Sequence, residues 1–305
     1  MLQRYNFFLI YEKKIVILRL MKHIRIISPS GVITPEFILR TQTCLEEKGY
    51  RVSIGKNSLQ QYGRFAGIKE QRLSDINEAL ADPSIDIILC SRGGYGLQQI
   101  VDKIQLPIRP KEQWPLIVGY SDITILHSLM ALHGVPSLHA PMCKELKDIN
   151  LSGYEDIRFI TNKGRIGKSE AKIIGGNLSV LYGLQGTSWD LNNIIDTIDH
   201  APILLIEDIA ESHYHIDRMM NNLRLSGVLG RISGLVVGHF TDCTDDDRMG
   251  CSIKETILQS VSEYDYPVMF DAPIGHESPN IPILLGGYYL LEITSHESVL
   301  KRSNV

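Results

Sequence analysis

Apolar and polar positions alternate regularly through the first half of the chain. Short apolar runs rich in β-branched residues predict strands at residues 24–27, 50–54, 85–90 and 116–118. Between them, apolar residues recur at helical spacing and predict helices at residues 35–48, 73–81 and 123–132. Strands that alternate with helices in this way are typical of a parallel sheet covered by helices. The pattern therefore predicts an α/β domain with a parallel sheet over residues 21–150.

The pattern changes in the second half of the chain. It weakens over residues 151–170, which we interpret as a linker. Later strand candidates lie at residues 203–206, 235–237, 268–270 and 288–293, and helix candidates at 214–225 and 253–264. These strands are less evenly spaced than those of the first half, and glycines are more frequent among them. Residues 171–305 are therefore predicted to form a smaller mixed α/β domain that is partly barrel-like.

The first twenty residues stand apart from this alternation. Their apolar stretch, residues 7–11, is short, and Glu12, Lys13 and Lys14 interrupt it. No small-residue cleavage site follows, and the segment is too short and too charged to span a bilayer. We interpret residues 1–20 as an N-terminal extension of unknown role, with an added strand, a partner contact or a signal sequence as alternatives.

The composition is that of an ordinary globular protein. Hydrophobic residues make up 44% of the 305 residues and charged residues 22%, which excludes a disordered chain. The formal net charge of −4 gives no indication of a nucleic-acid partner. The five cysteines are scattered and form no Cys-x-x-Cys pair, which argues against a disulfide scaffold. A reducing, cytoplasmic location fits this cysteine usage best.

The candidate chemistry begins where the fourth predicted strand ends. Gly119, Tyr120, Ser121 and Asp122 follow that strand, and a helix is predicted from Ile123. A serine at a strand-to-helix turn resembles the nucleophile elbow of hydrolases, whose turn exposes the hydroxyl above the sheet. Unpaired N–H groups at the start of the helix would favour a developing oxyanion. Ile123 stands where an elbow normally has glycine, and capping of the helix by Ser121 or Asp122 is the alternative interpretation.

A glycine-rich loop, Ser91–Gly96, follows the predicted strand 85–90. Glycines at the carboxyl end of a parallel strand let the backbone approach a ligand closely. The loop contains neither a P-loop nor a full dinucleotide-binding fingerprint, so phosphate binding is the weaker alternative. We expect the loop to face Ser121 across the top of the sheet and to donate a backbone N–H.

A serine nucleophile needs a base, and the base needs an acidic partner that orients it. Among the ten histidines, His276 lies in a loop of turn residues after the predicted strand 268–270, which suits a general base. Glu207 ends the apolar run 203–206 and is the candidate acid. A lone loop histidine is more often without a function. Charge compensation at the start of a helix is the alternative interpretation for the carboxylates here, and it suits Asp208 and Glu211 better than Glu207.

No metal or cofactor site emerges from the sequence. The acidic loop at residues 242–247 lacks the spacing of an EF-hand, and we expect it to be a solvated turn. His213 and His215 have no clear third ligand in the sequence.

Taken together, these segments resemble the LD-carboxypeptidase family of serine peptidases, which includes the murein tetrapeptide carboxypeptidases and the microcin-immunity peptidases. The resemblance covers about residues 21–292. It rests on blocks in the same order along the chain: Ser91–Gly96, Val118–Asp122, His139–Met142, Gly175–Ser179, Leu205–Asp208 with Asp217–Met219, and Gly275–His276 with Asn280. One departure is Ala140, which stands where the family usually has the glycine of His-Gly-Pro.

The resemblance implies a flavodoxin-like parallel-sheet domain at the amino-terminal side and a smaller, barrel-like α/β domain at the carboxy-terminal side. It also implies a catalytic triad of Ser121, Glu207 and His276 that spans the two domains. It implies no cofactor, and it implies a homodimer. The expected reaction is hydrolysis of the L,D-amide bond that releases terminal D-alanine from murein tetrapeptide through an acyl-enzyme. This reaction belongs to cell-wall recycling in the cytoplasm, with a muropeptide as the small-molecule substrate and with neither a membrane nor a nucleic acid as a partner.

The resemblance also implies an oxyanion site made of the backbone N–H groups of Asp122 and of Gly93 or Gly94. Candidate substrate-binding residues are Arg92, Tyr95 and Asn280. Because a carboxypeptidase must hold the terminal carboxylate of its substrate, Arg92 is a candidate for that contact. A structural ion pair would explain Arg92 equally well.

Two other functions remain open at this point. One is a microcin-immunity-type peptidase that acts on peptidyl-nucleotides, although the chain lacks the length for the long insertions of those relatives. The other is a two-domain protein that binds a small molecule in a cleft without catalysis. The sequence does not distinguish diaminopimelate from lysine in a murein substrate.

Overall fold

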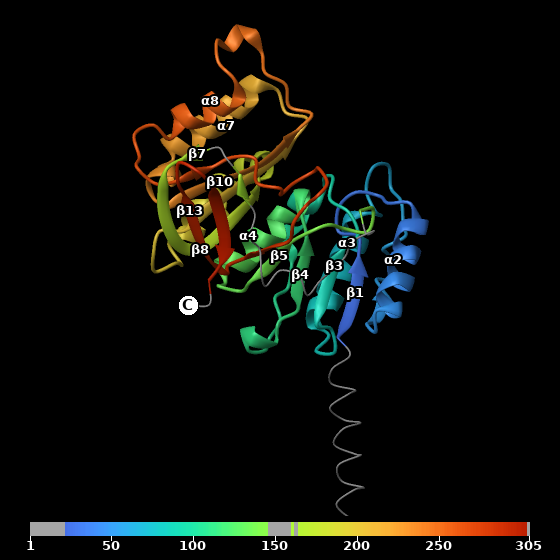
Figure 1. The fold of residues 1–305 in the computed structure, drawn as a ribbon. Helices are drawn as coiled ribbons and strands as arrows, with labels where there is room; N and C mark the ends of the chain where they lie inside the picture. Colours follow the sequence, from blue (N-terminus) through green and yellow to red (C-terminus); the bar gives the residue numbers. More distant parts are fainter. Residues whose placement is uncertain (1–21, 146–159, 162–163, 304–305) are drawn as a thin grey trace, which may run out of the picture.

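The first domain is a parallel sheet with helices on both faces (Figure 1). The computed structural model describes residues 22–145, 160–161 and 164–303. The elements of the first domain are β1 (His23–Ile27), α2 (Pro35–Glu47), β2 (Arg51–Ile54), α3 (Lys69–Ala81), β3 (Ile87–Cys90), β4 (Leu116–Gly119), α4 (Thr124–Leu132) and β5 (Ser137–His139). The strand order is β12-β5-β4-β3-β1-β2, and β1 to β5 are parallel. This is the flavodoxin-like order 2-1-3-4-5, with one strand added at the edge.

Alternation of side chains along the strands gives this sheet two apolar faces. On β1, Ile24 and Ile26 face the core that contains Ile38 and Leu45 of α2. Ile27 faces the opposite core, to which α3 and α4 contribute. The helices therefore bury both faces, as expected for a parallel sheet.

The second domain is built on a curled, half-barrel sheet. Its elements are β6 (Ile160–Thr161), β7 (Gly164–Arg165), β8 (Gly167–Asn177), α5 (Leu178–Gly183), α6 (Leu191–Ile195), β9 (Ile203–Ile209), α7 (His213–Leu225), β10 (Gly234–Thr241), α8 (Ile253–Ser260), β11 (Val268–Met269), β13 (Tyr288–Ile293) and β14 (Ser298–Arg302). The strand order is β6-β14-β13-β8-β9-β10-β11-β7. The four strands from β8 to β11 are parallel, and their carboxyl ends carry Asn177, Glu207 and the residues after β11. The predicted fold class, a flavodoxin-like domain with a smaller barrel-like domain, is confirmed.

A short strand, β12 (Ile283–Leu285), joins the two domains. It follows β11 in the sequence, yet it pairs antiparallel with β5 of the first sheet, with Ile283 opposite His139. Its side chains alternate, so that Leu284 packs in the core of the first domain while Ile283 and Leu285 pack in the core of the second. One strand thus fixes the two domains against each other.

Several elements differ from the predictions in length. Helix α3 starts at Lys69 rather than at residue 73, because its first turn is polar and gave no apolar signal; the side chain of Gln71 accepts the N–H of Ile68 there. Strand β9 continues through the buried Glu207 and Asp208 to Ile209, and α8 ends at Ser260.

Strands β7 and β8 begin within the segment that we interpret as a linker, and the domain boundaries stay a prediction. Residues 1–20 and the greater part of that linker lie outside the described residues. Of the helices in the described part of the chain, none combines the length and the apolar character needed to cross a membrane.

Candidate active site

Ser121 lies in a strained turn between β4 and α4. Its backbone φ of 64° is in the left-handed region, which residues other than glycine rarely adopt. A β-carbon at Gly119 would lie 2.9 Å from Cγ1 of Ile123, so Ile123 takes the room that a side chain at position 119 would need. The glycine that allows this turn therefore precedes the serine, which explains the departure from the usual elbow pattern.

The side chain of Asp122 connects this turn to two other loops. Its Oδ2 accepts hydrogen bonds from Oγ of Ser30 at 2.6 Å and from the N–H of Leu97 at 3.1 Å. Burial raises the pKa of Asp122, and these hydrogen bonds oppose the rise. No side chain among the described residues caps the start of α4, so the capping interpretation of Ser121 and Asp122 does not hold.

The glycine-rich loop reaches the serine, as expected. A β-carbon at Gly93 would lie 2.8 Å from Cβ of Ser121, 3.0 Å from its Oγ and 3.2 Å from the backbone nitrogen of Asp122. Within the described residues, the N–H groups of Gly93 and Gly94 donate no hydrogen bond, whereas the carbonyl of Gly93 accepts the N–H of Gly31 at 3.0 Å. A side chain at position 93 would collide with Ser121, so only a glycine fits there without a shift of the serine.

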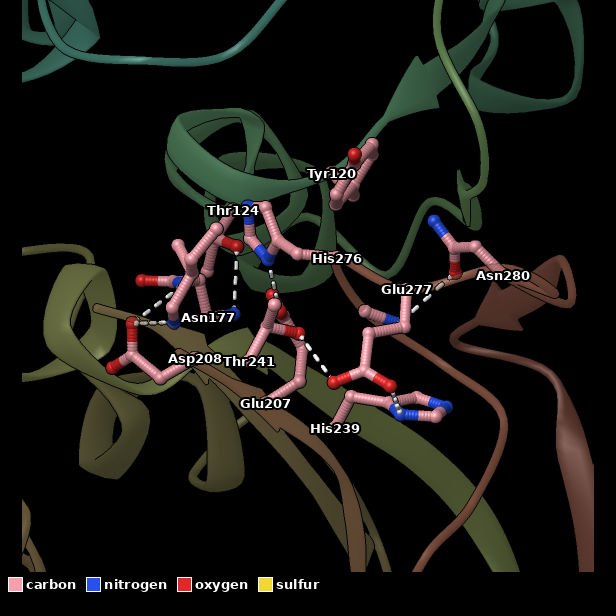
Figure 2. Close-up of polar contacts among 12 residues, drawn as sticks. Tyr120, Thr124, Asn177, Glu207, Asp208, His239, Thr241, His276, Glu277 and Asn280 are labelled. Atoms are coloured by element: carbon pink, nitrogen blue, oxygen red, sulfur yellow. Dashed lines mark hydrogen bonds and ion pairs between the residues drawn. The ribbon is translucent and has the colours of Figure 1, made fainter. Parts of the chain in front are cut away.

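Glu207 and His276 are in direct contact. Nδ1 of His276 lies 2.8 Å from Oε2 of Glu207, and both side chains come from the carboxyl edge of the second sheet (Figure 2). Gly275 allows this approach, because a β-carbon there would lie 3.1 Å from Oε2 of Glu207. Asn280 shapes the same loop, since its Oδ1 accepts the N–H of Gly275 at 3.0 Å.

The charges of this pair reinforce each other. Burial acts to raise the pKa of Glu207, but the proximity of His139 together with the hydrogen bond and the charge of His276 outweighs it and lowers that pKa to about 2. Burial acts to lower the pKa of His276, but the hydrogen bond and the charge of Glu207 outweigh it and leave that pKa raised. The pair is therefore a fixed carboxylate beside an imidazole of increased basicity.

A cavity of about 310 Å³ opens over these groups. Its lining consists of Ser91, Arg92, Gly93, Gly94, Tyr120, Ser121, Met142, Lys144, Glu145, Ile209 and His276. Ser121 and His276 thus face one space, although no hydrogen bond joins these two described side chains; active-site contacts of this kind are often long in the absence of a substrate. The ring of Tyr120 packs edge-on against His276 with the centroids 4.8 Å apart (Figure 2).

The three candidate substrate-binding residues lie in different surroundings. Arg92 lines the cavity, and its Nη1 donates to the carbonyl of Val32 at 2.7 Å, which leaves the other guanidinium N–H groups without a partner among the described residues. Tyr95 is 42% exposed and packs on Phe65 outside the cavity lining. Asn280 is also outside the lining, where it supports the His276 loop.

Comparison with known proteins gives this arrangement its context. The sequence profile of the LD-carboxypeptidase N-terminal domain matches residues 24–140, and that of the LD-carboxypeptidase C-terminal domain matches residues 170–291. The chain belongs to the LD-carboxypeptidase family. It is therefore a peptidase.

Relatives of this peptidase span nearly its whole length. It is 30% identical to the "Probable murein peptide carboxypeptidase" of Bacillus subtilis (90% of each chain) and 28% identical to the murein tetrapeptide carboxypeptidase of Pseudomonas aeruginosa (84% of this chain, 89% of the relative). The crystal structure of muramoyltetrapeptide carboxypeptidase from Oxalobacter formigenes matches with a TM-score of 0.79 at 25% identity, over 93% of this chain and 99% of the other. The microcin C7 self-immunity protein of Escherichia coli is a more distant relative, 24% identical over 85% of this chain and 86% of the relative.

Two buried groups of this LD-carboxypeptidase were missed as site residues. His139 ends β5 with its Nε2 3.7 Å from Oε1 of Glu207. Asp208 follows Glu207, and burial together with the charge of Glu207 raises the pKa of Asp208 to about 7 against the opposing effect of its hydrogen bonds. The available signal for His139 was its place at the end of a strand beside the serine strand, in a block that the family resemblance already contained.

Asp208 belongs to a network that crosses the domain interface. It accepts hydrogen bonds from the N–H of Ser179 at 2.8 Å and from Nδ2 of Asn177 at 3.0 Å. The N–H of Asn177 in turn donates to Oγ1 of Thr124, at the start of α4, at 3.0 Å (Figure 2). The helix behind Ser121 is thereby attached to the strand beside Glu207.

Over residues 22–145, 160–161 and 164–303, no three His, Cys, Asp or Glu side chains are grouped so that they could hold a metal ion. The cavity that contains Ser121 offers hydroxyl, imidazole and backbone N–H groups, which are the groups that acyl transfer requires.

Proposed function

We propose that this LD-carboxypeptidase is a serine enzyme that releases terminal D-alanine from murein tetrapeptide. The observation that carries the proposal is that Ser121 and His276 line one cavity, with Glu207 held 2.8 Å behind the histidine. A hydroxyl, an imidazole and a carboxylate in this order supply the nucleophile, the base and the orienting acid of acyl transfer. The left-handed backbone at Ser121 supports the role of nucleophile.

In the proposed reaction, His276 acts as the general base. Its Nδ1–H donates to Glu207, so the lone pair on Nε2 is free for the hydroxyl of Ser121. Nε2 accepts the proton as Oγ attacks the amide carbonyl, and the charge of Glu207 stabilises the imidazolium that forms. The raised pKa of His276 favours this proton transfer.

The tetrahedral intermediate would place its oxyanion at the backbone N–H groups of Asp122 and of Gly93 or Gly94. Each such donor contributes a factor of about 10² to 10³ to kcat in enzymes of this type. His276 then donates its proton to the amine of the departing D-alanine. A water molecule, deprotonated by the same imidazole, attacks the acyl-enzyme and restores the free hydroxyl of Ser121.

The cavity suits a peptide that ends in a carboxylate. Arg92 and Lys144 both line its wall, and their positive charges can hold the terminal carboxylate of the substrate. The names of the Bacillus and Pseudomonas relatives support murein peptides as the substrate class. We further propose that the peptidase works in the cytoplasm and as a homodimer; its five unpaired cysteines agree with a reducing compartment.

A digest of purified muropeptides tests the substrate. Wild-type protein and the Ser121→Ala variant are incubated with tri-, tetra- and pentapeptide muropeptides, and the products are identified by mass spectrometry. The wild type should remove one alanine from the tetrapeptide alone, and the variant should remove none. An unchanged tetrapeptide, or equal release by the variant, would contradict the proposal.

Two further measurements test the alternative functions, an immunity-type peptidase and a protein that only binds a small molecule. A peptidyl-nucleotide offered in place of the muropeptide would be cleaved preferentially by an immunity-type peptidase. A fluorophosphonate probe should label Ser121 in the wild type, whereas a protein that only binds small molecules would stay unlabelled.

A further inference from the structure

The second histidine near Glu207 has an unusual environment. His139 is fully buried at the end of β5, and neither of its ring nitrogens has a hydrogen-bond partner among the described residues. Buried polar groups in folded proteins are rarely left in this state, because an unpaired donor or acceptor loses its hydrogen bonds to water without replacing them. A function that needs this ring at this position would explain why an apolar residue does not take its place.

The carboxylate opposite His139 also has an oxygen without a hydrogen-bond partner. Oε2 of Glu207 is bound to His276, but Oε1 has no hydrogen-bond partner in the described part of the chain, although the side chain is fully buried. Oε1 faces Nε2 of His139 at 3.7 Å. Because ordinary N–H···O bonds are about 3.0 Å long, a movement of less than about 1 Å would pair Nε2 of His139 with Oε1 of Glu207 and leave only Nδ1 of the ring without a partner.

We propose that His139 is a positioning residue for the base: as a neutral ring with its proton on Nε2, it holds Oε1 of Glu207 and thereby keeps Oε2 directed at His276. This inference rests on the proposed triad, and it adds a fourth member that touches neither the substrate nor the nucleophile. Glu207 would then accept from one imidazole on each oxygen, with opposite tautomers on the two rings.

Two of the three titratable groups that face His139 are uncharged. The titratable groups that face it are Glu207 from β9, His127 from α4 and Tyr120 from the turn after β4. Burial lowers the pKa of His127 to about 3, and burial raises the pKa of Tyr120, so both of these neighbours are uncharged. A neutral donor stabilises the carboxylate without placing a second positive charge beside the imidazolium that forms during the reaction.

His139 belongs to the first domain, so its contact with Glu207 would also join the two domains. Residue 139 pairs with Gly119 in the first sheet, two positions before Ser121, whereas Glu207 and His276 belong to the second domain. The sheet thus sets the spacing between His139 and the nucleophile. A hydrogen bond from His139 to Glu207 would align the acid and the base of one domain with the serine of the other.

The decisive experiment measures how fast a fluorophosphonate labels Ser121 as a function of pH. We compare the wild type with His139→Phe, which fills the site without a donor, and with His139→Gln, which keeps an N–H donor near the position of Nε2. The Phe variant should label about tenfold more slowly at its optimum. The fall of its labelling rate at low pH, here called the acid limb, should also move to higher pH. A carboxylate with one donor removed interacts more strongly with protonated His276 and so raises the pKa of that residue.

The Gln variant should restore both the rate and the position of the acid limb. A residue that only fills space would leave the acid limb in place, so a correctly folded Phe variant with wild-type rate and limb would overturn the proposal. Labelling of wild-type protein that is absent, or equal in Ser121→Ala, would instead refute the triad itself.

A measurement on the unmodified protein covers the case in which the Phe variant does not fold. Nitrogen-15 histidine spectra of the wild type report the tautomer of each ring. His139 should be neutral with the proton on Nε2, and His276 should carry a proton on Nδ1. A proton on Nδ1 of a neutral His139, or an imidazolium at neutral pH, would overturn the proposal.

Discussion

Two histidine–glutamate pairs lie close together at the carboxyl edge of the second sheet, and they differ in what surrounds them. In the first pair, His276 and Glu207 are 2.8 Å apart, with 13% and 0% of their side chains exposed. In the second pair, His239 and Glu277 are 3.0 Å apart, with 22% and 49% exposed. Figure 2 shows both pairs, separated by a single peptide bond between His276 and Glu277. Distance alone does not distinguish them.

The neighbouring groups do distinguish them. The histidine of the first pair lines the cavity of Ser121, Gly93 and Gly94, and Glu207 lies buried behind it, outside the lining. The second pair borders a cavity of about 390 Å³ whose other polar groups are carboxylates, a lysine, a serine and a cysteine, without a strained nucleophile. Burial strengthens the interaction of the first pair, while solvent screens the exposed carboxylate of the second. A histidine–glutamate contact becomes a catalytic candidate through burial and through the third group beside it.

The largest expected difference between the two pairs is in activity. Glu207→Gln should lower kcat/KM for the muropeptide by about 10³ to 10⁴, as loss of the orienting acid does in other serine hydrolases. The matched variant His239→Asn should keep wild-type kcat/KM. Steady-state assays of D-alanine release measure both, and comparable losses in the two variants would remove the distinction between the pairs.

A second expectation concerns the approach of the glycine-rich loop to Ser121. Gly93→Ala should lower kcat by about 10²-fold, because its β-carbon would displace the serine or the oxyanion donors. Gly183→Ala in α5 is the control, since a β-carbon there meets only the end of Gln98, at 3.6 Å. If the two variants show equal turnover and equal melting temperatures, the loop has no part in the reaction.

The pH dependence of the first pair follows from its charges. The reaction needs neutral His276, so kcat/KM should fall as the pH drops through the pKa of that residue, which lies above the usual 6.5. In Glu207→Gln, the two largest causes that raise this pKa, the hydrogen bond to the carboxylate and its charge, are lost while burial still lowers it. The acid limb of the residual activity should therefore move to lower pH, and a limb that stays in place would mean that another group titrates.

The smallest expected effect concerns the attachment of the second domain to the serine helix. Thr124→Val leaves the buried N–H of Asn177 without its acceptor and should lower the free energy of unfolding by about 1–3 kcal/mol. The matched change Thr43→Val on the exposed face of α2 should cost less than about 0.5 kcal/mol. Urea titration measures both values. Equal stabilities would show that the hydrogen bond does not contribute to holding the domains.

Much of the architecture could be predicted because it depends on local signals. Apolar runs with turn residues at their ends located most of the strands of the first sheet and four strands of the second. Those same ends held Ser121, Glu207 and His276, since side chains at the carboxyl ends of parallel strands reach the ligand side of a sheet.

The remaining features depend on contacts between distant segments. The sequence of strand β8 is polar and rich in glycine, so it gave no strand signal. Its position is set by pairing with β9 and β13. The short strands β5 and β12 carry too few residues for a periodic signal, and their pairing places His139 beside Glu207. The contacts of His139 with Glu207 and of Asp208 with Asn177 could not be predicted, because in each case the partner lies in another element.

Strand β12 also determines how the protein can be divided. A fragment that stops near residue 150 would contain every element of the first sheet except this one, so the unpaired backbone of β5 would be exposed along its edge. Uncovered strand edges of this kind recruit other chains, and such a fragment is expected to aggregate or to capture a β12 from another molecule. Expression as two separate halves is therefore a poor route to this protein, and the last part of the chain must be synthesised before the first sheet can be completed.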